Sequence, residues 1–447
     1  MFQELGPDAR ALLEVVAFFP QGIDENNIDW LFPSIPNRGD IFDKFCTLSL
    51  TYRSNDFATM LAPLRDHLRP KDPKSSPLLC ATKKHYFSRL SAGADPDNPD
   101  FEGSRWITSE DVNVEHLLDV FTSADANSDD VWNACAHFVG HLSWHKRRLV
   151  MLGPKIEELP DDHPSKPQCL FQLSRLFDSI GNFSESKRLL THTLQLQRER
   201  GDDLGVAQTL TSIADDYPLR GTQEEQIMQA KEASKIYERL GHMTGQVDSL
   251  QRLALLLAED DQADAAEVAA SRAIDLSLGK PTQSQAVNHH NILSHICHSR
   301  GDTEAAINHL KTALGTTPLL GSQDGQTAIF RRLLTLLIAE ERFDDAQVQL
   351  ERFKSKIVND PRNLGLAMVI QGRVWFLQNK LEEARSELSC ALDLYEKIGL
   401  SGGFLWHDAK SGLEEIERKM NSRVTPPSDE SGDDGELFGT CYLSCPL

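Results

Sequence analysis

The chain has 447 residues, of which 40% are apolar, so it is long enough for about two to four domains and can bury a substantial core. It carries 46 Lys and Arg against 67 Asp and Glu, a net charge of −21. Duplex nucleic acid and anionic membrane surfaces are themselves polyanionic. The charge balance therefore argues against both as main partners.

Membrane and secretory segments are not expected. No apolar run approaches the roughly 18 to 20 residues of a membrane span. The most apolar early run, "ALLEVVAFF" from Ala11 to Phe19, contains Glu14 and lacks the basic leader and cleavage site of a signal peptide. The eight cysteines are scattered and form no dense disulfide framework, which favours a reducing compartment. We therefore expect a cytoplasmic protein.

Residues 1–72 contain signals for helices and one hairpin. "PDARALLEVVAFFP" predicts an amphipathic helix with Pro7 near its start and Pro20 closing it. "ENNIDWLFP" and "GDIFDKFCTL" predict two shorter helices. "LSLTY" and "FATML" flank the turn residues "RSND" and predict a hairpin, and "APLRDHLRP" predicts one more helix.

This order of three helices and a hairpin is similar to a winged-helix domain. We therefore expect a winged-helix-like module over residues 1–72. No basic recognition helix is evident, so we interpret the module as structural. A winged-helix regulator of transcription that binds DNA stays open as an alternative.

Residues 73–160 are expected to form a helical linker that leads into a repeat array. "GADPDNPDFEG" is a loop by composition, while "VNVEHLLDVF" and "VWNACAHFVGHLSWHKRRLVML" predict helices. "LPDDHPSK" marks the boundary. At the other end of the chain, residues 421–447 are polar and acidic, and we expect a disordered tail.

A repeat of about forty residues occupies residues 161–420. One column of mostly small residues recurs at spacings of 40, 40, 40, 40 and 38, and a second column lies twelve residues upstream of it. Apolar residues at i, i+3 and i+7 in each unit predict two amphipathic helices joined by a turn. One such pair cannot bury its own face, so six are expected to stack into a superhelix, with an irregular helical bundle as the alternative. The first column is Ser186, Gln226, Ala266, Ala306, Ala346 and Ala384, and the second is Ser174, Ala214, Ala254, Ser294, Leu334 and Gly372.

The pattern resembles the tetratricopeptide repeat. The resemblance rests on Leu253-Ala254 with Leu257 in a first helix and on "GDTEAAINHLKTAL" around the turn and second helix. It covers residues 165–399, with a capping helix near 406–420. It implies a mainly α protein, with a right-handed solenoid of about six helix pairs. The unit is longer than the usual 34 residues and lacks the helix-ending proline. Longer units are similar to the signalling and motor-adaptor branches, so a cargo or motor adaptor is the alternative function.

The domain order resembles the C-terminal half of fungal signal-transducing ATPases of the NACHT or NB-ARC kind. "LGPDARALLEVVAFFPQGI", "LPDDHPSK" and "RERGDD" are similar to stretches of those chains. The resemblance implies a sensor, in which a protein segment bound to the repeats relieves inhibition of an ATPase module. No G-x-x-x-x-G-K-[ST] phosphate loop occurs, and Met1 lies almost at the start of the winged-helix-like segment. We therefore expect a non-enzymatic scaffold or sensor, whose ATPase is lost, lies upstream or acts in trans.

The register and the resemblance together predict a protein-binding groove along the first helices. Arginines in a groove fit an acidic peptide, and the alternative is a solvated face without a dedicated ligand. Some tetratricopeptide domains clamp a chaperone C-terminus with Lys and Asn, but the corresponding positions here do not match. The predicted groove residues are Phe171, Arg175, Gln251, Asn291, His295, His298, Arg331, Thr335 and Arg373.

Two groups of histidines have spacings that metal ligands use. His137, His141 and His145 are spaced i, i+4 and i+8, and a second group lies between residues 289 and 298. Aromatic residues around the first group indicate a packing helix. The register places His290 and Cys297 of the second group in core columns. We expect no metal, no cofactor and no catalytic constellation, although an unrecognised enzyme site in the linker stays open.

The tripeptide Arg-Gly-Asp occurs three times, beginning at Arg38, Arg200 and Arg300. Glycine favours the left-handed position after a helix, and aspartate favours the N-cap of the next helix. We therefore interpret all three as helix joints rather than as adhesion motifs. Asp40 in particular is predicted to cap a helix that begins after it.

Overall fold

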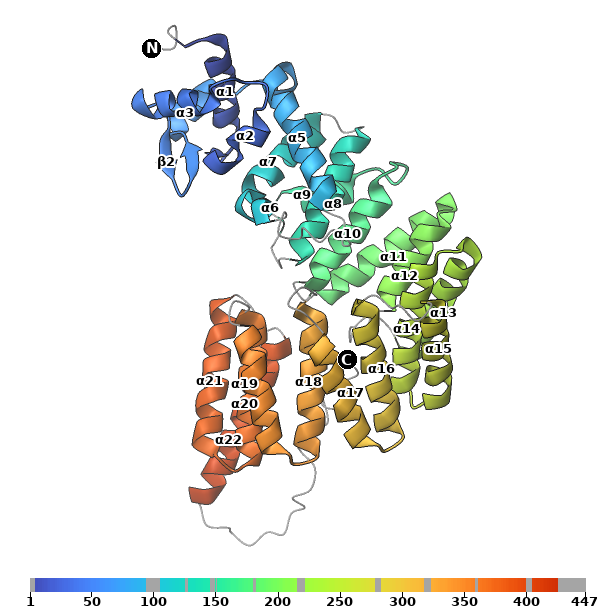
Figure 1. Ribbon diagram of the computed structural model, residues 1–447. Coiled ribbons are helices and arrows are strands. Elements are labelled where there is room, and N and C mark those ends of the chain that lie inside the picture. Colours follow the sequence, from blue (N-terminus) through green and yellow to red (C-terminus); the bar gives the residue numbers. More distant parts are fainter. Residues whose placement is uncertain are drawn as a thin grey trace. The chain divides into compact units, whose positions relative to one another are not determined.

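The computed structural model describes residues 5–93, 105–124, 128–144, 149, 151–179, 182–214, 222–277, 283–316, 323–357, 361–398 and 404–424. The loop expected around 94–103, His145 and the acidic tail beyond residue 424 lie outside this range. The chain divides into two compact units, Met1–Asp202 and Asp203–Leu447 (Figure 1).

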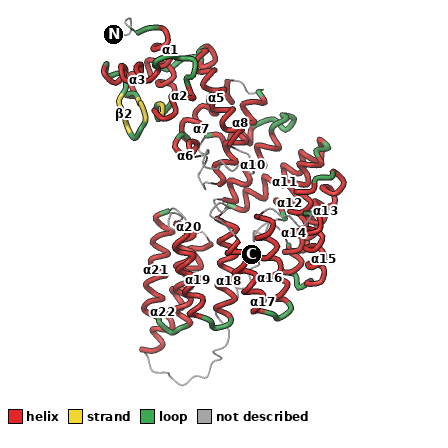
Figure 2. Tube along the Cα trace, in the orientation of Figure 1, coloured by secondary structure: helices red, strands yellow, loops and turns green. Residues whose placement is uncertain are grey.

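The N-terminal elements follow the expected order of helices and hairpin. The strands of the described chain lie in this segment, where β1, β3 and β2 form an antiparallel sheet in that order (Figure 2). The two-residue strand β1 was not predicted, because so short a strand has no alternating pattern to detect. The elements are α1 (Pro7–Phe18), β1 (Ile23–Asp24), α2 (Ile28–Leu31), α3 (Arg38–Thr47), β2 (Tyr52–Ser54), β3 (Phe57–Thr59) and α4 (Ala62–Leu68).

A glycine permits the pairing of β1 with β3. Gly22 has φ +84°, and a Cβ atom at this position would lie 2.2 Å from the carbonyl oxygen of Ala58. No side chain fits in that space, and L-residues rarely adopt that φ. Gly22 therefore lets the chain leave α1 and pass directly against β3.

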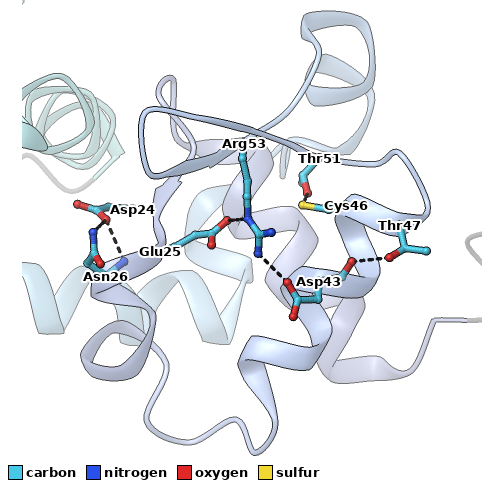
Figure 3. A network of polar contacts seen from close by, with 8 residues as sticks. All are labelled: Asp24, Glu25, Asn26, Asp43, Cys46, Thr47, Thr51 and Arg53. Atoms are coloured by element: carbon cyan, nitrogen blue, oxygen red, sulfur yellow. Dashed lines mark hydrogen bonds and ion pairs between the residues drawn. The ribbon is translucent and has the colours of Figure 1, made fainter.

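Arg53 on β2 connects the hairpin to α3 and to the short helical turn that begins at Glu25. Its Nε donates to Glu25 Oε1 and its Nη2 donates to Asp43 Oδ1 of α3, both at 2.6 Å (Figure 3). The turn between the strands uses Asn55 and Asp56 with φ of 49° and 69°, as a tight two-residue hairpin requires. The exposed cation of this hairpin is thus already engaged by two carboxylates.

A buried carboxylate joins these elements to the helices that follow. Glu110 accepts hydrogen bonds from Asn27 at 2.7 Å and from Tyr86 at 2.8 Å. Asn113 also donates to it at 2.8 Å. Burial raises the pKa of Glu110, while the three hydrogen bonds favour its charged form.

Helices from the expected linker share one hydrophobic core with the N-terminal elements. That core extends from Leu5 to Leu196. The domain boundaries expected at residues 72 and 160 stay predictions. The helices between them are α5 (Pro77–Gly93), α6 (Arg105–Ser109), α7 (Asp111–Ala124), α8 (Asp129–Trp144) and α9 (Leu152–Glu158).

The segment "LPDDHPSK" is a fixed connection between α9 and the first repeat. The buried Lys166 ammonium donates to the carbonyls of Glu157, at 2.9 Å, and Leu159, and lies 2.9 Å from the carboxylate of Asp161. Arg200 donates to backbone carbonyls of residues 161–164. Two cations therefore satisfy backbone carbonyls at the end of α9 and in this loop, and hold the loop in place.

Six helix pairs follow in the described chain, as the register predicted, and the first pair belongs to unit 1. All members of both small-residue columns are buried, so these are the positions where helices approach closely. The last helix, α22 (Phe404–Val424), packs on α20 and α21 as the predicted cap. The pairs are α10 (Lys166–Ser179) with α11 (Phe183–Arg200), α12 (Asp203–Ile213) with α13 (Gln223–Leu240), α14 (Met243–Glu259) with α15 (Ala263–Leu276), α16 (Gln283–Ser299) with α17 (Thr303–Thr316), α18 (Gln323–Ala339) with α19 (Phe343–Lys356), and α20 (Pro361–Leu377) with α21 (Leu381–Lys397).

Two of the three Arg-Gly-Asp tripeptides are helix joints of the predicted kind. Gly201 and Gly301 have φ of 68° and 82°; Gly201 follows α11 directly, and Gly301 lies two residues after the end of α16. Asp302 Oδ1 accepts a hydrogen bond from the backbone N–H of Ala305 at 3.0 Å, as an N-cap does. Arg300 binds the carboxylates of Asp264 and Glu267 at 2.9 and 2.7 Å.

The prediction for the first tripeptide was wrong. Helix α3 begins at Arg38, so Gly39 and Asp40 lie inside its first turn. The residue before the helix is Asn37, with φ 52°. Asparagine tolerates the left-handed region, so it takes the joint position that the sequence analysis gave to glycine. Arg38 is bound to Asp29 at 2.6 Å.

Within the described range, no helix has the length and apolar character needed to cross a membrane.

Candidate functional site

The predicted groove residues lie on first helices in both units. Phe171 and Arg175 belong to α10 in unit 1 and are half-buried. The other seven belong to α14, α16, α18 and α20 in unit 2. The candidate site described below is the part of this face that lies in unit 2.

Amide side chains on α14 and α16 present enclosed polar atoms. The amide Nε2 of Gln251 donates to the backbone carbonyl of Gln285 at 2.9 Å. Gln251 Oε1 and Asn291 Oδ1 are buried, and neither has a hydrogen-bond partner in the part of the chain that the structure describes. Buried polar atoms are normally paired, so these two oxygens require an explanation.

His295 and His298 are one turn apart on α16 but have different environments. The side chain of His295 is 4% exposed, and its Nδ1 lies 3.7 Å from Oε1 of Glu259 on α14. Burial, together with the charges of Arg332 and His298, holds the pKa of His295 well below its usual range. The ring of His295 is therefore neutral at pH 7. His298 is exposed, and its pKa is lowered less, first by partial burial and then by Arg332.

Helix α18 supplies the predicted Arg331 and Thr335, which are both half-buried. It also supplies Arg332, which the sequence analysis missed. Burial lowers the pKa of Arg332 to about 10, although the carboxylate of Glu259 favours its charged form. Its Nε atom is enclosed and has no hydrogen-bond partner among the described residues.

The repeat register does not single out Arg332. Forty residues earlier the same position holds Ile292, which is 1% exposed, but earlier repeats hold Gln172, Ser212 and Arg252 there. Because this column already accepts polar residues and one arginine, no sequence pattern marks Arg332 as a binding residue. Glu259 has no signal either, since it lies at the end of α14, where polar residues are common.

Arg373 on α20 faces acidic residues of the capping helix. Asp408 and Glu415 of α22 favour its charged form, while burial lowers the pKa of Arg373. Burial likewise raises the pKa of Asp408, and Arg373 opposes that shift. The cap therefore supplies two counter-charges to Arg373, whereas a single carboxylate, Glu259 of α14, acts on Arg332.

The histidine groups do not form a metal site in the described range. No group of three His, Cys, Asp or Glu side chains is placed to hold an ion there. His290 Nδ1 lies 3.2 Å from His309 Nδ1. His290 and Cys297, which were expected in core columns, are half-buried. In the first group His141 is buried and His137 is half-buried.

A hollow of about 390 Å³ lies beside the N-terminal hairpin. No sequence pattern predicts this hollow. Tyr52 and Leu61 at its edge are 48% and 63% exposed, and the Cys46 thiol lies 3.5 Å from the Thr51 hydroxyl. Its lining residues are Cys46, Ser49, Leu50, Thr51, Tyr52, Arg53 and Leu61.

Comparison with known proteins identifies the fold. No protein-family model and no curated protein sequence matches this chain. The chain is similar to the solved structure of a Signal Transduction ATPase with Numerous Domains (STAND) protein with a tetratricopeptide repeat sensor from Pyrococcus horikoshii. The TM-score is 0.54 at 13% identity, over 94% of this chain and 61% of that one. The chain thus spans about three fifths of that protein.

Two further structures align less well. A Rap protein complexed with competence and sporulation factor aligns with a TM-score of 0.45 at 13% identity, over 76% of this chain and 99% of that one. The quorum sensor NprR from B. thuringiensis aligns with a TM-score of 0.40 at 9% identity, over 76% and 98%. These scores are too low to carry an argument. The first likeness shows that the chain has a tetratricopeptide-like helical repeat fold.

Proposed function

We propose that this chain is a non-enzymatic interaction module that binds a protein segment on the first-helix face of unit 2. The observation that carries the proposal is a set of four enclosed polar atoms that have no hydrogen-bond partner among the described residues. They are Gln251 Oε1 on α14, Asn291 Oδ1 and His295 Nε2 on α16, and Arg332 Nε on α18. Such atoms are costly in a face that serves packing alone, and a bound segment can offset that cost. Stacked helix pairs also provide an extended surface that suits a peptide.

We further propose that the chain is the sensor part of a signal-transducing ATPase system. The similar stretches and domain order of fungal NACHT or NB-ARC proteins support this, and the STAND structure combines an ATPase with a repeat sensor of the same fold. The ATPase would then be a partner in trans or a module outside this sequence. Residues 1–72 would act as a winged-helix-like structural module, because Arg53, the exposed cation of the hairpin, is held by carboxylates.

A matched pair of bulky substitutions tests the binding face. Thr335→Trp places an indole on the first helix of the fifth pair, and Val348→Trp places one on its second helix, where Val348 is 65% exposed. The full chain is used to select peptides from a random display library. We expect the affinity of a selected peptide to fall at least about tenfold in Thr335→Trp and to stay unchanged in Val348→Trp.

A loss of peptide affinity could also arise from unfolding of the variant. The melting temperatures of both variants are therefore compared with that of the parent chain. If no peptide is selected, or if the two variants bind equally well while both are folded, the proposed binding face is wrong.

A further inference from the structure

Arg332 has a positive charge without a partner. No hydrogen bond and no ion pair to its guanidinium is present in the described chain, and its Nε atom is enclosed. The acidic residue that acts on it is Glu259 on α14, through a longer-range interaction. The residue as a whole is half-buried, and even partial burial of a guanidinium without a salt bridge is unfavourable unless something else contacts it. Such a group on a candidate binding face therefore points to a ligand.

His295 is the second polar group of this cluster, since burial and then the charge of Arg332 lower its pKa. Helix α16 lies between α14 and α18 in the repeat order. Nδ1 of His295 on α16 lies 3.7 Å from Oε1 of Glu259 on α14. A neutral imidazole with its Nδ1–H toward that carboxylate leaves Nε2 as an acceptor. Nε2 is indeed enclosed without a partner among the described residues. The cluster thus contains an unpaired donor, Arg332, and an unpaired acceptor, His295.

We propose that Arg332 and His295 form a subsite for one acidic side chain of the bound segment. The guanidinium of Arg332 donates to the Asp or Glu carboxylate, and His295 Nε2 accepts from a backbone N–H of the same segment. The planar guanidinium matches a carboxylate in geometry, so the contact can be bidentate. This inference rests on the proposed function and names the chemistry that the site would recognise.

A carboxylate fits the subsite better than a phosphate does. Glu259 remains close to the cluster, and its negative charge repels a second anion. That repulsion is about twice as large for a phosphate group, which has a charge near −2 at pH 7. With Glu259 present, a bound carboxylate leaves the cluster with one uncompensated negative charge, whereas a bound phosphate leaves it with about two.

Three substitutions on the full chain test the assignment. Arg332→Gln removes the charge, and Arg332→Lys keeps the charge but loses the planar fork. Arg352→Gln is the control, because Arg352 is an exposed arginine on α19 of the same helix pair. The probes are peptides selected on the parent chain from a random library, synthesised with amidated C-termini so that only side chains supply carboxylates.

We expect the selected peptides to share an Asp or Glu. Changing it to Asn or Gln, or changing Arg332 to Gln, is expected to weaken binding about 10- to 100-fold. Both changes together should weaken binding no more than either alone, because they remove the same contact. Arg332→Lys should give an intermediate loss, and Arg352→Gln should bind like the parent.

Thermal stability separates this role from a structural one. Removing an enclosed and unpaired charge should leave the melting temperature of Arg332→Gln unchanged or higher. A clear fall in melting temperature would instead show that Arg332 supports the fold, and would overturn the inference.

The remaining outcomes are also decisive. Selected peptides that lack an acidic residue, or that bind Arg332→Gln like the parent, would overturn the subsite and leave the proposed function standing. Tighter Arg332-dependent binding of a phosphoserine version would overturn the choice of carboxylate. If no peptide is selected at all, the proposed function fails, and the subsite fails with it.

Discussion

Single residues in this protein determine both the turns that connect its helices and the polar groups of its candidate site. At the joint between α16 and α17, the N–H groups of Gly301 and Asp302 donate to carbonyls of α16, each at 2.9 Å. This closing pattern needs a residue in the left-handed region, and Gly301 has φ 82°. The local sequence is sufficient to predict such a joint, because capping depends on neighbours within a few residues.

Gly301→Val should destabilise the protein without affecting any receptor contact. A β-branched residue at positive φ is strained by about 1 to 3 kcal/mol, so the free energy of unfolding should fall by that amount. Gly301→Asn is the control, because asparagine tolerates this region. Urea denaturation of the three proteins measures the difference, and equal stability of Val and Gly variants would refute the joint interpretation.

The hairpin shows how one side chain can hold a whole element. Strands β2 and β3 are three residues long, and all side chains of β2 are exposed, so burial contributes little there. Instead of buried apolar contacts, ion pairs from Arg53 to Glu25 and to Asp43 of α3 attach the hairpin to the rest of the protein. Both contacts raise the pKa of Arg53 further above its usual value, so its charge does not depend on pH.

Arg53→Gln should loosen the hairpin while the rest of the core stays intact. The expected result is faster amide hydrogen exchange in residues 52–59, because the ties to residues 25 and 43 are lost. Lys44→Gln is the control, since Lys44 is an exposed cation on α3. Equal exchange in both variants would mean that the hairpin is held by its backbone pairing alone.

The whole molecule consists of two compact units that do not follow the boundary between linker and repeats. The first helix pair, α10 with α11, belongs to unit 1, because α10 packs closely on α8. Each unit has hydrophobic clusters of its own, from Leu5 to Leu196 in one and from Ala214 to Ile416 in the other. Separate cores are the physical basis for separate folding units.

Two core substitutions should therefore affect different unfolding transitions. Leu12→Ala and Leu334→Ala each remove a side chain that is fully buried, in unit 1 and unit 2 respectively. Each should cost about 2 to 5 kcal/mol in its own unit. Differential scanning calorimetry is expected to resolve two transitions, with one shifted by each variant. A single transition shifted equally by both variants would show that the units unfold together.

The sequence alone determined the helix pairs, their register and most of the turns. It could do so because each repeat is a local pattern of apolar and small residues, and each column repeats six times. The predicted cap and the N-terminal hairpin also follow from short-range signals. Strand β1 and the grouping of α10 with α8 depended on contacts between distant segments, which no local pattern encodes.

The candidate site was predicted only in part. The register correctly identified the first helices, but it could not show that His295 is enclosed against Glu259 or that Asp408 and Glu415 face Arg373. It also could not show that Arg332 Nε is enclosed without a hydrogen-bond partner in the described part of the chain. Whether a charge is paired depends on side chains from three or more helices, and that is decided only when the helices pack. The sequence thus determined the scaffold, and the tertiary structure decided which of its polar groups remain available to a ligand.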